Sequence, residues 1–190
     1  MVQAEFDGEK MSDDELKAFF VLLAVAANDT TRHASAQAIH AFSKFPDQRD
    51  LLVADVPGRV DSAVEEALRW GSPLLHMRRT AIEDFTLRGK EIKAGDKVVL
   101  WYNSANRDED VFDDPFTFDI LRNPNPHLAF GGGGPHFCLG AALARTMLRS
   151  LLTEVYTRIP DINAPEPHFQ VANFINGINR LPATWTPERR

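Results

Sequence analysis

Cysteine is nearly absent from this sequence, whose 190 residues include a single thiol, Cys138. A disulfide framework is therefore excluded, and a lone cysteine suits a reducing cytosol, so we expect a cytoplasmic protein. Zinc and iron–sulfur sites normally take several cysteines or a cysteine–histidine cluster, which one cysteine cannot supply.

Long hydrophobic runs and an excess of positive charge are also missing. The longest apolar stretch, Ala18–Ala27, is too short to span a bilayer, and the first ten residues are too polar for a signal peptide. The formal net charge of −6 gives no reason to expect nucleic acid as a partner. A length of 190 residues fits one domain with a sizeable core.

The most informative stretch runs from Phe130 to Gly140 and contains four consecutive glycines, Gly131–Gly134, before Cys138. Because glycine has no Cβ, it accepts positive φ and lets the backbone pass close to a flat ligand. The following residues, 141–152, have the apolar spacing of an amphipathic helix. Cys138 is therefore predicted near a helix N-terminus, where the helix dipole and free amides stabilise a thiolate.

A lone thiolate in such a loop can bind haem iron, attack a substrate or pack as a small apolar side chain. For the second use, His136 could act as the base. The glycines do not form a phosphate-binding P-loop, because no Gly-Lys-Ser/Thr sequence closes the run. The residues alone leave a ligand role and a structural role for Cys138 open.

The loop resembles the haem-ligand loop of cytochromes P450, which has an aromatic residue, glycines, a basic residue two before the cysteine, and then Cys-x-Gly. The similarity runs from about Ser12 to Trp185. In particular, the loop resembles that of actinobacterial members that hydroxylate sterols and branched lipids. One difference is that the aromatic residue usually stands seven positions before the cysteine, whereas Phe130 stands eight before it.

This resemblance implies that Cys138 is the thiolate ligand to the iron of haem b. It also implies that Phe130, Gly134 and Gly140 form part of the haem-binding loop, and that His136 binds a haem propionate. Cationic side chains suit carboxylates because Coulombic attraction and hydrogen bonding act together.

A capping box, Ser12 to Glu15, predicts the start of a helix that has no breaker until Pro46. Its first half is apolar nearly all round, which is typical of a helix that runs through a core. Asp29 and Thr30 lie in the middle of this helix, and their position alone predicts a solvent-facing polar patch. The resemblance instead implies the acid–alcohol pair that relays protons to dioxygen in P450s, with Ala27 where the family usually has glycine.

Two further helices are expected, Pro46–Ala54 and a segment from about Val60 to Trp70, separated by a break at Pro57-Gly58. The second contains Glu66 and Arg69, whose spacing lets their side chains meet. The pair is either a surface ion pair or, by resemblance, the Glu-x-x-Arg pair of P450s, completed by Arg122.

Short strands follow, and the predicted segments are Met77–Ile82, Phe85–Leu87, Glu91–Ile92 and Lys97–Leu100. The first strand contains Arg79, and a lone arginine in such a strand is usually just solvated. The resemblance instead implies that Arg79 binds a haem propionate, with Arg78 as the alternative candidate. Residues 101–126 are expected to be irregular, and Asn176-Gly177 predicts a β-hairpin. By resemblance, Pro73–His76, Phe174 and Ile175 border the substrate, although ordinary core packing explains them equally well.

The predicted fold is mainly α with small β-sheets, a single partial cytochrome P450 domain over residues 1–190 that lacks the N-terminal half of the family fold. The implied function is a haem-thiolate monooxygenase that hydroxylates a hydrophobic small molecule, such as a sterol or methyl-branched lipid. It would use O2 and electrons from ferredoxin and ferredoxin reductase. The alternative is a truncated, inactive remnant or binding module that cannot hold haem without a partner chain.

Overall fold

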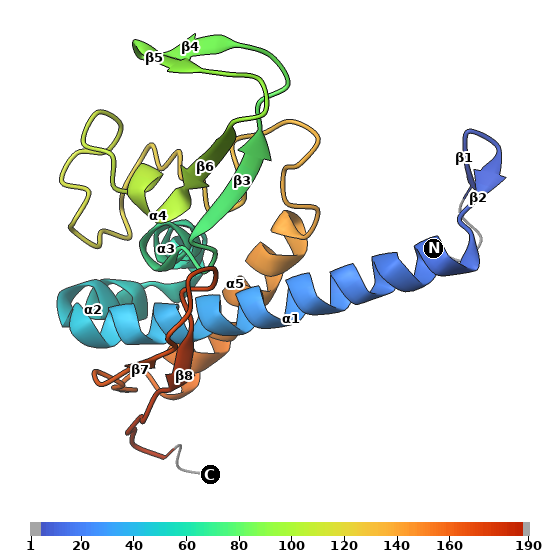
Figure 1. Ribbon diagram of the computed structural model, residues 1–190. Helices are drawn as coiled ribbons and strands as arrows, with labels where there is room; N and C mark the ends of the chain where they lie inside the picture. Colours follow the sequence, from blue (N-terminus) through green and yellow to red (C-terminus); the bar gives the residue numbers. More distant parts are fainter. Residues whose placement is uncertain (1–4, 188–190) are drawn as a thin grey trace.

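The computed structural model describes residues 5–187, which form a helical body with small antiparallel sheets on its surface (Figure 1). The helices are α1 (Asp13–Lys44), α2 (Pro46–Ala54), α3 (Val56–Gly71), α4 (Tyr102–Ala105) and α5 (Ala141–Arg158). The strands are β1 (Glu5–Phe6), β2 (Glu9–Lys10), β3 (His76–Thr80), β4 (Phe85–Leu87), β5 (Lys90–Ile92), β6 (Lys97–Trp101), β7 (His168–Phe169) and β8 (Ile178–Arg180).

The core lies where α2, α3 and α5 pack on the C-terminal half of α1. Phe42 of α1 is fully buried at its centre and makes edge contacts with the rings of Phe118 (5.2 Å) and Tyr156 (5.1 Å). Small side chains such as Ala38 and Ala63, both fully buried, let the helices approach closely. This core holds α3 and α5, the two helices that carry the polar residues described below.

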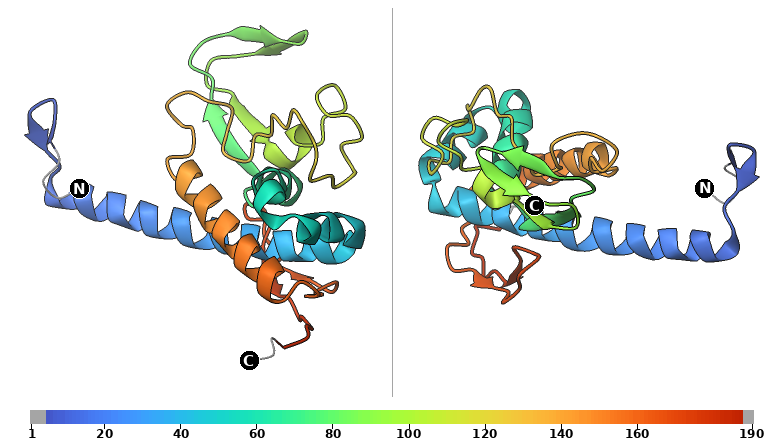
Figure 2. Two further views of the ribbon diagram at one scale, coloured as in Figure 1. Left: turned by 180° about the vertical axis from the view of Figure 1, so that it is seen from behind. Right: turned by 45° about the horizontal axis from the view of Figure 1, so that its top comes forward.

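Helix α1 begins where the sequence predicts, because both halves of the capping box form: Ser12 Oγ accepts from Glu15 N–H, and Glu15 accepts from Ser12 N–H (2.9 Å). Its N-terminal half extends away from the body (Figures 1 and 2). There Phe20, Leu22 and Val25 are 67%, 61% and 63% exposed. The apolar pattern of this half is that of a core helix, but no other element of residues 5–187 covers these side chains, so they are exposed in the chain described.

Helix α3 starts at Val56, about four residues earlier than predicted. Asp55 accepts a hydrogen bond from Gly58 N–H (3.0 Å) and so caps the helix, while Pro57 lies in the first turn, where its missing N–H has no partner to lose. The proline that predicted a break is instead part of a helix start.

The predicted strands all form, with ends shifted by at most two residues. β3 and β6 pair antiparallel, with Arg79 opposite Val98, and β4 and β5 form a hairpin that projects from the body (Figure 1). A short helix, α4, interrupts the stretch that was predicted to be irregular. The C-terminal hairpin of β7 and β8 exists, but Asn176-Gly177 is the end of a longer connection and not a two-residue turn.

Among residues 5–187, no helix combines the length and the apolar character needed to cross a membrane.

Candidate functional site

The cysteine loop closes on itself through backbone hydrogen bonds. Cys138 N–H donates to the carbonyl of Phe130 (3.0 Å), and Phe137 N–H donates to the carbonyl of Gly134 (3.0 Å). Gly131, Gly133 and Gly134 have φ of 93°, 95° and 77°, a region that side chains with a Cβ rarely adopt. The glycines are thus required by the path of the backbone, as their number in the sequence suggested.

The thiol of Cys138 is exposed just before α5. Gly140 is the N-cap residue of that helix, and its carbonyl accepts from Ala144 N–H (2.8 Å). Cys138 therefore lies two residues before the cap, near the positive end of the helix dipole.

Asp29 and Thr30 lie in the middle of α1. Thr30 Oγ1 donates to the carbonyl of Ala26 (2.7 Å), so the hydroxyl bonds back to its own helix. The Asp29 carboxylate pairs with Arg32 Nη2 (3.0 Å), and these two side chains are 50% and 63% exposed. Within residues 5–187, no hydrogen bond or ion pair joins this pair, or Arg79 on β3, to the cysteine loop.

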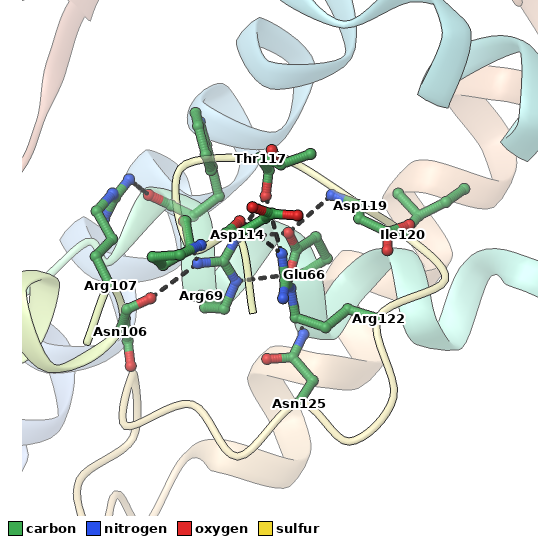
Figure 3. Close-up of polar contacts among 12 residues, drawn as sticks. Glu66, Arg69, Asn106, Arg107, Asp114, Thr117, Asp119, Ile120, Arg122 and Asn125 are labelled. Carbon is green, nitrogen blue, oxygen red and sulfur yellow. Dashed lines mark hydrogen bonds and ion pairs between the residues drawn. The ribbon is translucent and has the colours of Figure 1, made fainter. Parts of the chain in front are cut away.

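The Glu66–Arg69 pair is fully buried and is not a surface ion pair (Figure 3). Arg69 Nε and Nη2 donate to the two carboxylate oxygens of Glu66 (2.8 and 2.7 Å). The remaining guanidinium hydrogens bind main-chain carbonyls of the loop that follows β6, those of Asn106 (2.8 Å), Pro115 (2.9 Å) and Thr117 (2.9 Å). Arg69 thereby ties α3 to the segment that leads into the cysteine loop.

Arg122 joins this network as predicted. Its Nε lies 3.4 Å from Glu66 Oε2, which is the distance of an ion pair and not of a short hydrogen bond (Figure 3). Glu66 also accepts from Asp119 N–H (2.9 Å) and from Asn125 Nδ2 (3.1 Å). The buried carboxylate of Glu66 thus binds three residues of the loop, Asp119, Arg122 and Asn125.

A second cluster of charged side chains surrounds Glu65, the neighbour of Glu66. Arg145 of α5 donates to both oxygens of Glu65 (2.7 and 2.8 Å), and His127 Nε2 lies 2.9 Å from Oε2. Burial raises the pKa of Glu65, but the hydrogen bonds from His127 and Arg145, together with the positive charge of Arg145, outweigh it and lower the pKa to about 2. Glu65 is therefore an anion that links α3, the loop and α5.

The sequence profile of the family described as Cytochrome P450 matches residues 59–158, which include both charged clusters and the whole cysteine loop. This match covers more than half of the chain. The chain belongs to the cytochrome P450 family.

Individual P450s are similar along nearly the full chain. The methyl-branched lipid omega-hydroxylase of Mycobacterium tuberculosis is 53% identical over 187 residues, which cover 98% of this chain and 44% of that protein. The steroid C26-monooxygenase of the same organism is 46% identical, covering 98% of this chain and 42% of that protein. A Mycobacterium marinum P450 solved in complex with pseudoionone superimposes with a TM-score of 0.93 at 49% identity, covering 96% of this chain and 44% of that one. The chain therefore spans less than half the length of these relatives, and it has a partial P450 fold.

Haem is the cofactor that membership of this family implies, and the cysteine loop fits it. Cys138 offers an exposed sulfur, and a Cβ placed on Gly133 or Gly134 would meet no atom within 4 Å, so the space beside the loop is open. Phe137 and Leu139 add apolar surface that is 46% and 80% exposed, which suits a porphyrin. The sequence has one cysteine, and a single cysteine sulfur is the protein ligand expected for a P450 haem iron.

Sequence reasoning missed Asn106, which the fold buries completely. Its Nδ2 donates to Ser72 Oγ (2.9 Å), its Oδ1 accepts from Leu128 N–H (2.6 Å), and its carbonyl accepts from Arg69. It also missed the cluster of Glu65, His127 and Arg145. No local pattern marks these residues, because the side-chain hydrogen bonds that join Asn106 to Ser72 and Leu128, and Glu65 to His127 and Arg145, connect residues that are distant in the sequence.

Proposed function

We propose that this chain provides the thiolate ligand and part of the haem pocket of a monooxygenase that hydroxylates a hydrophobic small molecule. The observation that carries the proposal is the exposed thiol of Cys138 in a glycine loop open to a flat group. The substrate class is taken from the relatives, whose names specify methyl-branched lipids and steroids. A sterol or methyl-branched lipid is therefore the proposed substrate.

Haem, when bound, supplies the iron and the oxygen-activating chemistry of the family. In this proposal Cys138 is the ligand of that iron. The hydrogen bond from the Cys138 amide to the carbonyl of Phe130 keeps the sulfur in place. Gly134 and Gly140 keep side chains away from the porphyrin. Arg79 and His136 bind its propionates through charge-assisted hydrogen bonds.

Asp29 and Thr30 are proposed to move protons to the oxygen side of the pocket. Thr30 Oγ1 donates a hydrogen bond to the carbonyl of Ala26, so its lone pairs are left to accept a further hydrogen bond. Asp29 is paired with Arg32 through one carboxylate oxygen and is the acid of the proposed proton relay. The ion pair is weak because both side chains are at least half exposed, so it can open readily.

The proposed substrate border consists of residues 73–76 with Phe174 and Ile175. Leu75 N–H donates to the carbonyl of Phe174 (2.9 Å), and the rings of His76 and Phe174 lie 5.8 Å apart, so two distant segments form one apolar wall. Electrons would come from ferredoxin and ferredoxin reductase in the cytoplasm, as the resemblance to actinobacterial members implies.

A second candidate is a remnant or binding module that cannot hold haem without a partner chain. The exposed apolar side chains on the N-terminal half of α1 favour it, because a large uncovered patch is typical of a surface that binds another polypeptide.

The carbon monoxide difference spectrum of the haem-reconstituted, reduced chain separates the two candidates. The thiolate-type carbonyl band supports the first, and Cys138→Ala should abolish it, because the sequence holds no other cysteine. Val171→Ala, at a fully exposed position, serves as the control that should keep the band. A band that survives Cys138→Ala would falsify the ligand assignment, whereas failure of the unmodified chain to bind haem would favour the second candidate.

A further inference from the structure

Two ion pairs connect α3 to α5, one helical turn apart. The outer pair, Asp61 with Arg149, has side chains that are 72% and 46% exposed. The inner pair, Glu65 with Arg145, is more buried, with side chains 31% and 32% exposed, and is bidentate. The inner pair also has an aromatic neighbour and a histidine partner, and the proposed function above gives no role to Glu65, Arg145 or this histidine.

His127 holds the carboxylate of Glu65 from the loop side. Its side chain is only 2% exposed, Nε2 lies 2.9 Å from Glu65 Oε2, and Nδ1 accepts a hydrogen bond from Ala129 N–H (3.2 Å). Since Nδ1 is an acceptor, the ring proton is on Nε2 and points at Glu65. Glu65 is therefore held by two partners. Its bidentate ion pair with Arg145 fixes the orientation of the guanidinium.

The guanidinium of Arg145 lies over the ring of Phe130, with 4.5 Å between its central carbon and the ring centroid. A planar cation at this distance is attracted to the face of the ring. The carbonyl of the same Phe130 accepts the amide hydrogen of Cys138 (3.0 Å). A continuous set of contacts thus runs from α3 through Arg145 and Phe130 to the cysteine.

We propose that Arg145 is a positioning residue of the cysteine loop: held by Glu65, it fixes the ring of Phe130 and, through the carbonyl of Phe130, the backbone of Cys138. The contacts of Arg145 with Glu65 and Phe130 are here called the clamp. The role of the clamp in positioning haem rests on the proposed function, but the contacts themselves involve only the polypeptide. The clamp has a clear task, because four glycines between Phe130 and the cysteine leave that part of the loop without side chains to hold it.

The test uses amide hydrogen exchange, followed by NMR on the isotopically labelled chain without haem. Arg145→Met should accelerate exchange of the Cys138 amide about tenfold, because its acceptor on Phe130 is no longer held. The Phe137 amide, which donates to Gly134 within the same loop, should change little. Arg149→Met removes the outer ion pair of the same helices and is the matched control, so it should leave both rates unchanged.

Three further variants separate a local effect of Arg145 on the loop from a general loss of stability. Glu65→Gln should reproduce the acceleration, whereas Arg145→Lys should restore little of the protection, because lysine keeps the charge but not the planar fork. In a Phe130→Leu background, Arg145→Met should add nothing to the exchange rate, since the two residues act in series.

Equal acceleration at Phe137 and Cys138, full protection in Arg145→Lys, or additive effects with Phe130→Leu would each overturn the clamp. These outcomes do not depend on haem. The clamp can therefore fail while the thiolate-type carbonyl band is present, and it can hold while that band is absent.

Discussion

Arg69 is a charged residue whose side chain has no exposed surface. Burial of a charge is tolerated only when its hydrogen-bonding capacity is satisfied. Its guanidinium makes five hydrogen bonds, two to Glu66 and three to main-chain carbonyls. Figure 3 shows how the loop is wrapped around this pair. Removal of either partner leaves the other buried and unpaired.

We expect Arg69→Met to lower the free energy of unfolding by about 3–5 kcal/mol, the usual cost of breaking a buried ion pair. Urea denaturation followed by circular dichroism measures it. Lys17→Met is the matched control, because Lys17 forms an ion pair of the same i,i+3 spacing with Asp14 in full exposure, and it should change stability by less than about 1 kcal/mol. Equal effects of the two substitutions would contradict a special role for the buried pair.

Glu65 should make the chain sensitive to acid. Its pKa in the folded chain is lowered from 4.5 to about 2, so the carboxylate contributes stability above pH 4.5 that is lost as the pH falls toward 2. The side chain is 31% exposed, which limits the contribution to ~1–2 kcal/mol.

Urea midpoints measured between pH 5 and 2 therefore should fall less steeply in Glu65→Gln than in the unmodified chain. Glu154→Gln, at an exposed pair on α5, is the control that should keep the original slope. Parallel slopes for Glu65→Gln and the unmodified chain would show that Glu65 does not sense the pH.

At the scale of elements, the C-terminal segment is fastened to α1 and α3 by a few polar contacts. His33 of α1 is buried and accepts a hydrogen bond from Ile178 N–H (3.1 Å). Asn176 Nδ2 donates to the carbonyl of Gly71 at the end of α3 (2.7 Å). Gly177 between them lies so close to α1 that a Cβ would be 2.9 Å from His33 Nε2 and 2.7 Å from Gln170 Oε1.

Gly177→Ala should therefore push this segment off α1 and destabilise the chain by about 1–3 kcal/mol. Amide exchange of Ile178 and thermal unfolding measure the local and the global effect. Gly132→Ala is the control, because its Cβ would have only an ordinary contact, 3.9 Å from Leu128. An Ile178 amide that is equally protected in Gly177→Ala would show that the segment can make room.

At the scale of the whole molecule, the N-terminal half of α1 extends away from the helical body (Figure 2). Its side chains Phe20, Val21, Leu22 and Val25 are exposed. Contiguous apolar surface of this kind promotes association. Leu22→Lys should weaken self-association measured by sedimentation about tenfold and reduce binding of an apolar fluorescent dye, with unchanged helix content.

Val171→Lys is the matched control, because Val171 is an exposed apolar residue that belongs to another surface. Association that responds equally to both substitutions, or to neither, would exclude the α1 patch as its cause.

Local patterns in the sequence predicted most elements. The capping box at Ser12, the proline at the start of α2 and the glycines before Cys138 all act through contacts within a few residues, and each produces the predicted backbone. The pairing of Glu66 with Arg69 follows from helical spacing alone. Pro57 misled the prediction, because a proline breaks a helix in its interior but is accepted in its first turn.

The sequence by itself determined the family, the cysteine loop and the order of the helices, since these depend on residue types at short spacing. Only the tertiary structure decided which charges are buried and which apolar surface is covered. The partners in the side-chain hydrogen bonds of Glu65, Asn106 and Arg145 are 22 to 80 residues away, and no local pattern encodes such contacts. The apolar first half of α1 reads as core in the sequence, yet burial depends on what packs against it, and here no described element does.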